Sequence, residues 1–230
     1  MSPPPRQLTL DLPHAPSFAR DDFLTAPSNR DALAAVERWP DWPGQMLLLV
    51  GPEGSGKSHL AAIWAGRTGA TIVKMDALTE SSFASFAQSP ALAIEDIDRF
   101  GDQEERLFHL LNMALNSKIW MLLTARSPAD AWGFRTPDLV SRLRLAPIAR
   151  LEAPDTELVE AVLFKLFSDR QLNVDSKVVA FIASRIERSL GVARSLVAAL
   201  DSEALAQGRR VTRGIAAELL QTCSDPDPLP

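Results

Sequence analysis

The chain has 230 residues, 46% of them hydrophobic, which is enough for one large domain or for a large and a small one. Its formal net charge of −5 argues against a protein held on DNA mainly by its overall charge, but leaves local basic patches open. The single cysteine, Cys223, excludes an internal disulfide and a cysteine-rich zinc site. No apolar run is long enough to span a bilayer, so we expect no membrane association and a cytoplasmic location.

The first 22 residues predict an extended arm. Three consecutive prolines, followed by Pro13 and Pro16, oppose helix formation. Within this arm, the stretch QLTLDL at 7–12 carries leucine at alternate positions. That pattern fits either an edge strand or an extended peptide that another protein binds.

From residue 23 onward, patterns typical of helices and strands alternate. A helix is predicted over 28–39, with Ser28 or Asn29 as its N-cap. Helical patterns and short apolar runs that are typical of buried strands then predict a parallel sheet with helices on both faces. The expected strands are 45–51, 71–77, 91–98 and 119–126, and the expected helices between them are 58–69, 81–89 and 103–117.

After Pro154 the pattern becomes purely helical. Helical periodicity is present over 155–172, 175–187, 191–208 and 212–223. We therefore predict an α/β domain followed by a small all-helical one. The expected divisions are an arm at 1–22, the α/β domain at 23–153, the helical domain at 154–223 and a tail at 224–230.

The stretch GPEGSGKS at 51–58 matches the phosphate-loop pattern G-x-x-x-x-G-K-[ST]. A buried strand precedes it and a helix follows, which is the context that this motif requires. Gly54 and Gly56 let the backbone turn its N–H groups toward phosphates, and Lys57 is expected to reach the β- and γ-phosphates. Ser58 offers a hydroxyl group to Mg²⁺. The alternative, a glycine-rich turn with an incidental lysine, leaves both flanking elements unexplained.

Acidic residues follow the third apolar run, in the stretch IEDID. Glu95 and Asp96 are placed to orient the water shell of Mg²⁺ and to polarise an attacking water molecule. Together with Ser58 they form the expected magnesium site. Asp98 is expected to be a solvated residue or a helix cap.

With these motifs in place, the chain resembles AAA+ ATPases, and among them the branch of the bacterial replication initiator. The resemblance covers roughly residues 18–220, and the absence of further domains makes it greatest to the short initiator homologues of the Hda family. The segments that carry it are FLTAPSNRDAL, LLLVGPEGSGKSHL, LAIEDID, LLTARSPAD, PDLVSRLRL and LGVARSLVAAL.

The resemblance implies an α/β AAA+ domain with a parallel five-stranded sheet, followed by a helical lid, and it implies ADP or ATP with Mg²⁺ as ligands. Phe23 and Leu24 are then expected to line the adenine pocket. Thr124 is expected to act as sensor 1, Arg194 as the sensor 2 arginine of the lid, and Asp96 as a catalytic acid. The remaining expected nucleotide contacts are Pro52, Glu53, Gly54, Ser55, Gly56, Lys57, Ser58 and His59.

The resemblance also implies a function, which is negative regulation of replication initiation. Arg142 is the expected arginine finger, acting in trans on ATP bound to the initiator DnaA, and Arg144 competes for that role. The peptide at 7–12 is expected to bind the DNA polymerase sliding clamp. The protein is then expected at the replisome, with indirect DNA contact and a homodimeric or nucleotide-linked oligomeric state. The residues expected to contact the clamp are Gln7, Leu8, Leu10 and Leu12.

Two positions depart from the initiator pattern. Arg126 stands where the initiator has an acid after sensor 1, and Glu95 replaces the usual aspartate. Both departures predict a weak intrinsic ATPase and a bound nucleotide that acts mainly as a switch. Two alternatives stay open, which are a DNA-associated ATPase of the helicase-loader type and a scaffold that only tethers to the clamp.

Overall fold

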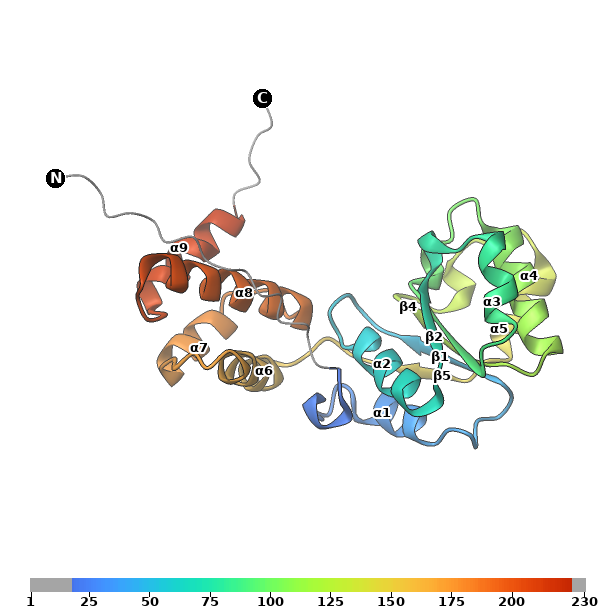
Figure 1. Cartoon of the computed structure of the whole chain (residues 1–230), viewed down its shortest axis with the longest axis horizontal. Helices are drawn as coiled ribbons and strands as arrows, with labels where there is room; N and C mark the ends of the chain where they lie inside the picture. Colours follow the sequence, from blue (N-terminus) through green and yellow to red (C-terminus); the bar gives the residue numbers. More distant parts are fainter. Residues whose placement is uncertain (1–17, 225–230) are drawn as a thin grey trace, which may run out of the picture. The chain divides into compact units, whose positions relative to one another are not determined.

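The computed structural model describes residues 18–224, which divide between Ala153 and Pro154 into two compact units (Figure 1). We call residues 18–153 the α/β unit and residues 154–224 the helical unit. The expected clamp peptide at 7–12 lies outside the described residues.

The α/β unit is built on a parallel sheet of five strands in the order β2-β3-β4-β1-β5. This confirms the predicted fold class. The fifth strand was not located from the sequence, because its three residues are too few for a periodic pattern. The strands are β1 (Met46–Val50), β2 (Thr71–Lys74), β3 (Ala91–Glu95), β4 (Trp120–Ala125) and β5 (Ile148–Arg150).

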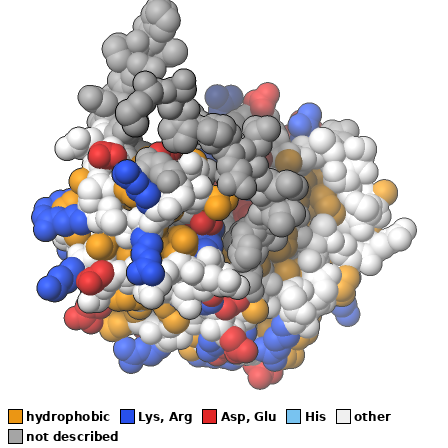
Figure 2. Space-filling view, turned by 60° about the vertical axis from the view of Figure 1, so that its left-hand side comes forward, with side chains coloured by type: hydrophobic (Ala, Val, Ile, Leu, Met, Phe, Trp, Pro, Cys, Tyr) orange, Lys and Arg blue, Asp and Glu red, His pale blue; other side chains and the backbone are white. Residues whose placement is uncertain are grey.

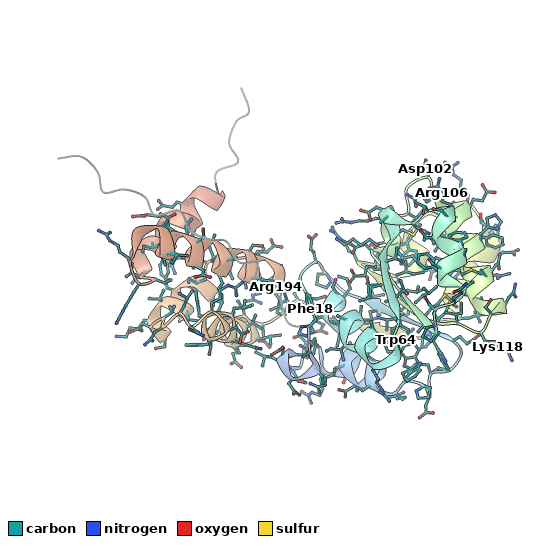
Figure 3. The ribbon with its side chains drawn as sticks, in the orientation of Figure 1. Phe18, Trp64, Asp102, Arg106, Lys118 and Arg194 are labelled. Atoms are coloured by element: carbon teal, nitrogen blue, oxygen red, sulfur yellow. The ribbon has the colours of Figure 1, made fainter. Side chains whose placement is uncertain are left out.

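Helices cover both faces of this sheet, as Figure 1 shows. Because both faces are buried, the central strands are apolar throughout: Leu48 faces one core cluster, whereas Leu47 and Leu49 face the other. One cluster lies beneath α4 and α5, and the other, which includes Trp64, lies beneath α1 and α2 (Figure 3). The helices are α1 (Arg30–Glu37), α2 (Lys57–Thr68), α3 (Phe83–Phe86), α4 (Glu104–Asn116) and α5 (Pro137–Arg144).

The helical unit has a core of its own, with Phe167, Val179 and Ile182 among its most buried side chains. Asp155 caps α6 by accepting a hydrogen bond from the backbone N–H of Leu158. No helix in residues 18–224 is both long and apolar enough to cross a membrane. The helices of this unit are α6 (Thr156–Asp169), α7 (Ser176–Ala183), α8 (Leu190–Gln207) and α9 (Arg213–Ser224).

Several elements are shorter than the sequence predicted. β2 ends at Lys74, because the chain turns there into a short 3₁₀ helix that buries Met75. β3 ends at Glu95, since Asp96 adopts the left-handed conformation (φ 53°) that interrupts a strand. Asn29 stands at the N-cap position of α1, but its side chain makes no capping hydrogen bond.

Candidate functional site

The loop after β1 is fixed between two neighbouring strands. The Gly51 N–H donates to the carbonyl oxygen of Ala125 over 3.1 Å, and the Leu151 N–H donates to that of Val50 over 2.7 Å. A Cβ atom on Gly51 would come within 2.6 Å of the Leu151 carbonyl oxygen. Only glycine therefore fits at the first position of the motif.

Two glycines then give the loop its curl. Gly54 (φ 71°) and Gly56 (φ 105°) both have positive φ, a conformation that side chains disfavour. Gly56 is the N-cap of α2, so the N–H groups at the start of that helix have no side-chain cap. These features form the curled backbone and helix start expected of a phosphate loop.

Two polar side chains of the motif are buried. Ser55 is 2% exposed, and its hydroxyl oxygen has no partner among the described residues. Lys57 is 7% exposed, and its ammonium group donates to the carbonyl oxygens of Gly51 (2.7 Å) and Pro52 (2.8 Å). Ser58 is exposed. These residues fit a phosphate group, since the site combines a buried cation, a buried hydroxyl and the start of a helix.

The acids at the end of β3 lie beside Thr124, the expected sensor 1 residue. The Asp96 N–H donates to the hydroxyl oxygen of Thr124 over 3.0 Å, and Thr124 is 1% exposed. Glu95 is half-buried at the end of β3. Within the described residues, no group of three potential protein ligands surrounds a metal position. Mg²⁺ does not require one, because it commonly binds one or two carboxylates together with phosphates and water.

Asp98 differs from its expectation as a solvated residue or a helix cap. One of its oxygens accepts a hydrogen bond from the Arg126 N–H over 2.9 Å, and the other is buried without a described partner. Asp98 therefore ties the segment after β3 to the end of β4. A pattern of neighbouring residues does not reveal this link, because the two residues are 28 positions apart.

Arg126, the residue that departs from the initiator pattern, forms an ion pair with Glu53 of the phosphate loop. Arg99 approaches the same carboxylate, at 3.9 Å. Glu53 is thus connected to the ends of both β3 and β4. The sequence pointed to Glu53 and Arg126 separately, but it did not indicate that they pair.

This arrangement changes the electrostatics of Lys57. Burial lowers the pKa of its ammonium group, and the charge of Arg126 lowers it further. The carboxylates of Asp96, Asp98 and Glu53 oppose the shift without cancelling it. The buried cation is therefore short of negative charge, a deficit that an anionic ligand would offset.

The expected adenine-pocket residues lie next to this loop. The Phe23 ring is 6% exposed and meets His59 of α2 edge-on, with the ring centroids 5.1 Å apart. Asn29 positions this segment, since its amide accepts a hydrogen bond from the Ala26 N–H (2.9 Å) and donates one to the Leu24 carbonyl (3.0 Å). The structure therefore brings Phe23 and His59 together and makes Asn29 their support rather than a helix cap.

The expected arginine finger lies elsewhere in the α/β unit. Arg142 is half-buried on α5, donates a hydrogen bond to Asn112 of α4, and packs over the Phe108 ring at 5.3 Å. Arg144 is exposed and pairs with Asp130 at 2.7 Å. Both arginines lie in the last turn of α5.

The helix starts show where Arg142 lies along α5. Glu104, the first residue of α4, accepts hydrogen bonds from the N–H groups of Arg135 and Thr136, just before α5. α4 and α5 thus start side by side and run from the carboxyl edge of the sheet, where the loop lies, toward the opposite edge. At 1.5 Å per residue, Arg142 lies roughly 8 Å along α5 from the start of that helix.

Arg194 is half-buried on α8 of the helical unit (Figure 3). Burial lowers the pKa of its guanidinium group, and the nearby charge of Arg170 adds to that effect. Its role as the sensor 2 arginine stays a prediction.

Comparisons with known proteins agree with this geometry. A family model described as an AAA domain matches residues 46–185. The replication initiator DnaA of Cutibacterium acnes is 26% identical in an alignment 200 positions long that covers 76% of this chain and 40% of that protein. The chain thus spans less than half the length of this relative.

Solved structures show the same fold. Domain III of DnaA from Thermotoga maritima superposes with a TM-score of 0.77 and 20% identity, over 92% of this chain and 99% of that domain. AMPPCP-bound DnaA from Aquifex aeolicus gives a TM-score of 0.65 and 14% identity, over 83% and 67% of the respective chains. With the family model matching more than half of its residues, the chain belongs to the AAA domain family and has a DnaA-like AAA+ fold.

Proposed function

We propose that this chain is a negative regulator of replication initiation of the Hda type, which stimulates ATP hydrolysis by the initiator DnaA. Its similarity to DnaA of Cutibacterium acnes, together with the DnaA-like fold, supports a place within the same AAA+ branch. Domains of this kind assemble through heterologous contacts, in which one subunit meets the next. A partner subunit that is itself DnaA would use the same contact.

We infer that the phosphate loop binds ADP or ATP with Mg²⁺. DnaA from Aquifex aeolicus, whose fold this chain shares, has been solved with AMPPCP. Lys57 and the start of α2 would hold the phosphates, and Ser58, Glu95 and Asp96 would hold the metal. When bound, the triphosphate supplies a cleavable phosphoanhydride bond. Arg126 stands where the initiator carries an acid, and it is paired with Glu53. This arrangement favours slow cleavage of the bound nucleotide.

The position of Arg142 is the observation that carries the regulatory proposal. Its contact with Asn112 holds it along α4, away from the phosphate loop of its own chain. A guanidinium at that place is suited to a phosphate held by a neighbouring molecule, where an arginine finger accelerates hydrolysis by about 10³- to 10⁵-fold. To act, Arg142 must exchange its contacts with Asn112 and Phe108 for that phosphate. Arg144, which is more exposed, is the competing candidate.

The peptide at 7–12 supplies the proposed tether. Gln7, Leu8, Leu10 and Leu12 would bind the sliding clamp as an extended peptide, with the leucines in an apolar pocket. Tethering to the clamp would restrict the regulator to replisomes in the cytoplasm. It would also couple inactivation of the initiator to ongoing replication.

A reconstituted reaction tests this proposal. DnaA loaded with γ-labelled ATP is mixed with clamp-loaded DNA and the purified chain, and phosphate release is followed. We expect Arg142→Ala to lower the stimulated rate by about 10³-fold or more. The control variant Arg106→Ala, which removes an exposed arginine from α4, should leave the rate unchanged.

The same reaction separates the alternatives. Arg144→Ala should retain most of the stimulation; if it abolishes the stimulation while Arg142→Ala does not, the finger is Arg144. Stimulation that survives both substitutions would support the scaffold alternative. A steady-state ATPase of the chain alone that DNA accelerates strongly would instead support a helicase-loader type of enzyme.

A further inference from the structure

The end of α7 and the start of α9 bring two arginine side chains onto one aromatic ring. The guanidinium carbon of Arg185 lies 4.0 Å from the centroid of the Phe181 ring, and that of Arg213 lies 4.5 Å from it. Arg213 is the first residue of α9, which packs against α7. Two like charges, one from the turn after α7 and one from the start of α9, therefore share one ring, whose negative faces offset their repulsion.

Three more arginines extend this region. Arg209 and Arg210 lie in the turn that joins α8 to α9, within four residues of Arg213, a length of chain that spans at most about 14 Å. Arg188 follows Arg185 by three residues. All five side chains are exposed. We call Arg185, Arg188, Arg209, Arg210 and Arg213 the arginine surface. Figure 2 shows blue Lys and Arg side chains that stand out toward solvent on the face that it draws.

The charge of this surface is not neutralised within the described part of the chain. None of its five arginines forms an ion pair with an acid among residues 18–224. Arg185 donates instead to the Phe181 carbonyl (3.2 Å) and to the Ser184 hydroxyl (2.9 Å), which orient it without neutralising it. Glu187 lies between Arg185 and Arg188 in the sequence and is exposed.

We propose that the arginine surface binds the phosphate backbone of DNA directly. Guanidinium groups match phosphates in shape and can bind them through paired hydrogen bonds. Several of them, in the turns next to α7 and α9 and at the start of α9, suit a ligand with repeated phosphates. With a net charge of −5, the whole chain does not attract DNA, so the attraction is local and sensitive to salt. This replaces the expectation of indirect DNA contact and does not depend on the regulatory function.

A membrane or an apolar protein partner fits this region less well. The exposed large hydrophobic side chains of the helical unit are Phe164, Val192 and Leu205. Val192 follows Arg188 by four residues and Leu205 precedes Arg209 by four, whereas Phe164 is distant in sequence. Isolated exposed apolar side chains are common on protein surfaces and do not form an apolar contact area.

Fluorescence anisotropy with a short labelled DNA duplex tests the proposal on the full chain. The variant carries Arg209→Gln, Arg210→Gln and Arg213→Gln. At about 50 mM salt we expect its Kd to rise about tenfold or more. We also expect the plot of log affinity against log salt to become shallower by about 2–3, because each lost phosphate contact removes about 0.9 from the slope.

The matched control removes three exposed cations from the α/β unit instead, through Arg38→Gln, Arg106→Gln and Lys118→Gln (Figure 3 labels Arg106 and Lys118). It changes the net charge by the same amount, and we expect its Kd to stay within about twofold of wild type. An equal loss in both variants would mean that overall charge, rather than this surface, governs binding. No binding by the wild-type chain would also overturn the proposal.

Two further measurements complete the test. Replacing the same three arginines with lysine retains the charge, so that variant should bind within about threefold of wild type. Binding as weak as that of the glutamine variant, with an unchanged melting temperature, would contradict a salt-sensitive attraction that depends mainly on charge. Polyglutamate at equal charge concentration should not displace the DNA; if it does, the partner is an acidic protein and the proposal fails.

Discussion

At the phosphate loop the charged side chains are tied to one another, whereas on the arginine surface they face solvent. Lys57 is buried and bonded to two carbonyl groups, and Arg126 is paired with Glu53. Arg209 and Arg210 are exposed, with no ion pair among the described residues. The first region is preorganised for a small anion in one position, and the second suits a long polyanion that contacts many positions weakly.

The largest effect expected on nucleotide binding concerns the buried cation. Replacing Lys57 by alanine should raise the Kd for ADP and ATP about 100-fold. A hydrogen bond to a charged group contributes about 1.5–3 kcal/mol, and each 1.4 kcal/mol is a tenfold change in affinity. Calorimetric titration of the purified chain measures this change.

The matched control for that experiment is Lys118→Ala, which removes an exposed lysine from the same unit. The Kd of Lys118→Ala for ADP and ATP should equal that of wild type. If Lys57→Ala binds nucleotide normally, the loop does not hold phosphates through this lysine. A circular dichroism melt of both variants separates loss of binding from loss of folding.

The two regions also differ in how far the sequence predicts them. The phosphate loop is specified by neighbours: Gly54, Gly56 and Lys57 stand within four residues, and the apolar run before them places them at a strand end. The short strand β5 escaped prediction, because three residues carry too little periodicity. The links from Asp98 to Arg126 and from Glu53 to Arg126 depend on tertiary structure, since they join segments 28 and 73 residues apart.

The arginine surface shows the same limit more clearly. Residues 185 and 213 meet at Phe181 only because α7 packs against α9. Neither arginine belongs to a motif, and the acidic net charge of the chain concealed a local basic region. The net charge of a sequence therefore does not exclude a local DNA-binding surface, which becomes visible only when the charges are placed in the structure.

A smaller effect is expected from loosening the phosphate loop. Glu53→Gln removes the partner of Arg126 and a negative charge beside the proposed phosphate position. Because the pair is partly exposed, the free energy of unfolding should change by less than about 1 kcal/mol. Nucleotide affinity should rise about two- to fivefold, since one repulsive charge is lost.

Glu105→Gln serves as its control, because that glutamate is exposed on α4. Glu105→Gln should change neither the free energy of unfolding nor the nucleotide affinity. Weaker nucleotide binding by Glu53→Gln would show that the ion pair supports the binding conformation instead of competing with the ligand. Calorimetric titration and urea unfolding provide the two measurements.

The smallest expected effect is a dependence of stability on pH. Burial lowers the pKa of Lys57 in the folded chain below its ordinary value of 10.5. Between that lowered value and 10.5 the unfolded chain binds more protons, so the contribution of Lys57 to the free energy of unfolding rises with pH. Below this window both states are protonated, and the full destabilisation by the buried charge is present.

Lys57→Met abolishes this titration. Wild type should therefore gain stability relative to Lys57→Met as the pH approaches 10.5, in urea unfolding without nucleotide. Lys118→Met corrects for general effects of losing a lysine. If the difference in the free energy of unfolding between wild type and Lys57→Met stays constant across alkaline pH, burial does not disfavour the charged form of Lys57. The shortage of negative charge around Lys57, on which its attraction for phosphate depends, would then be absent.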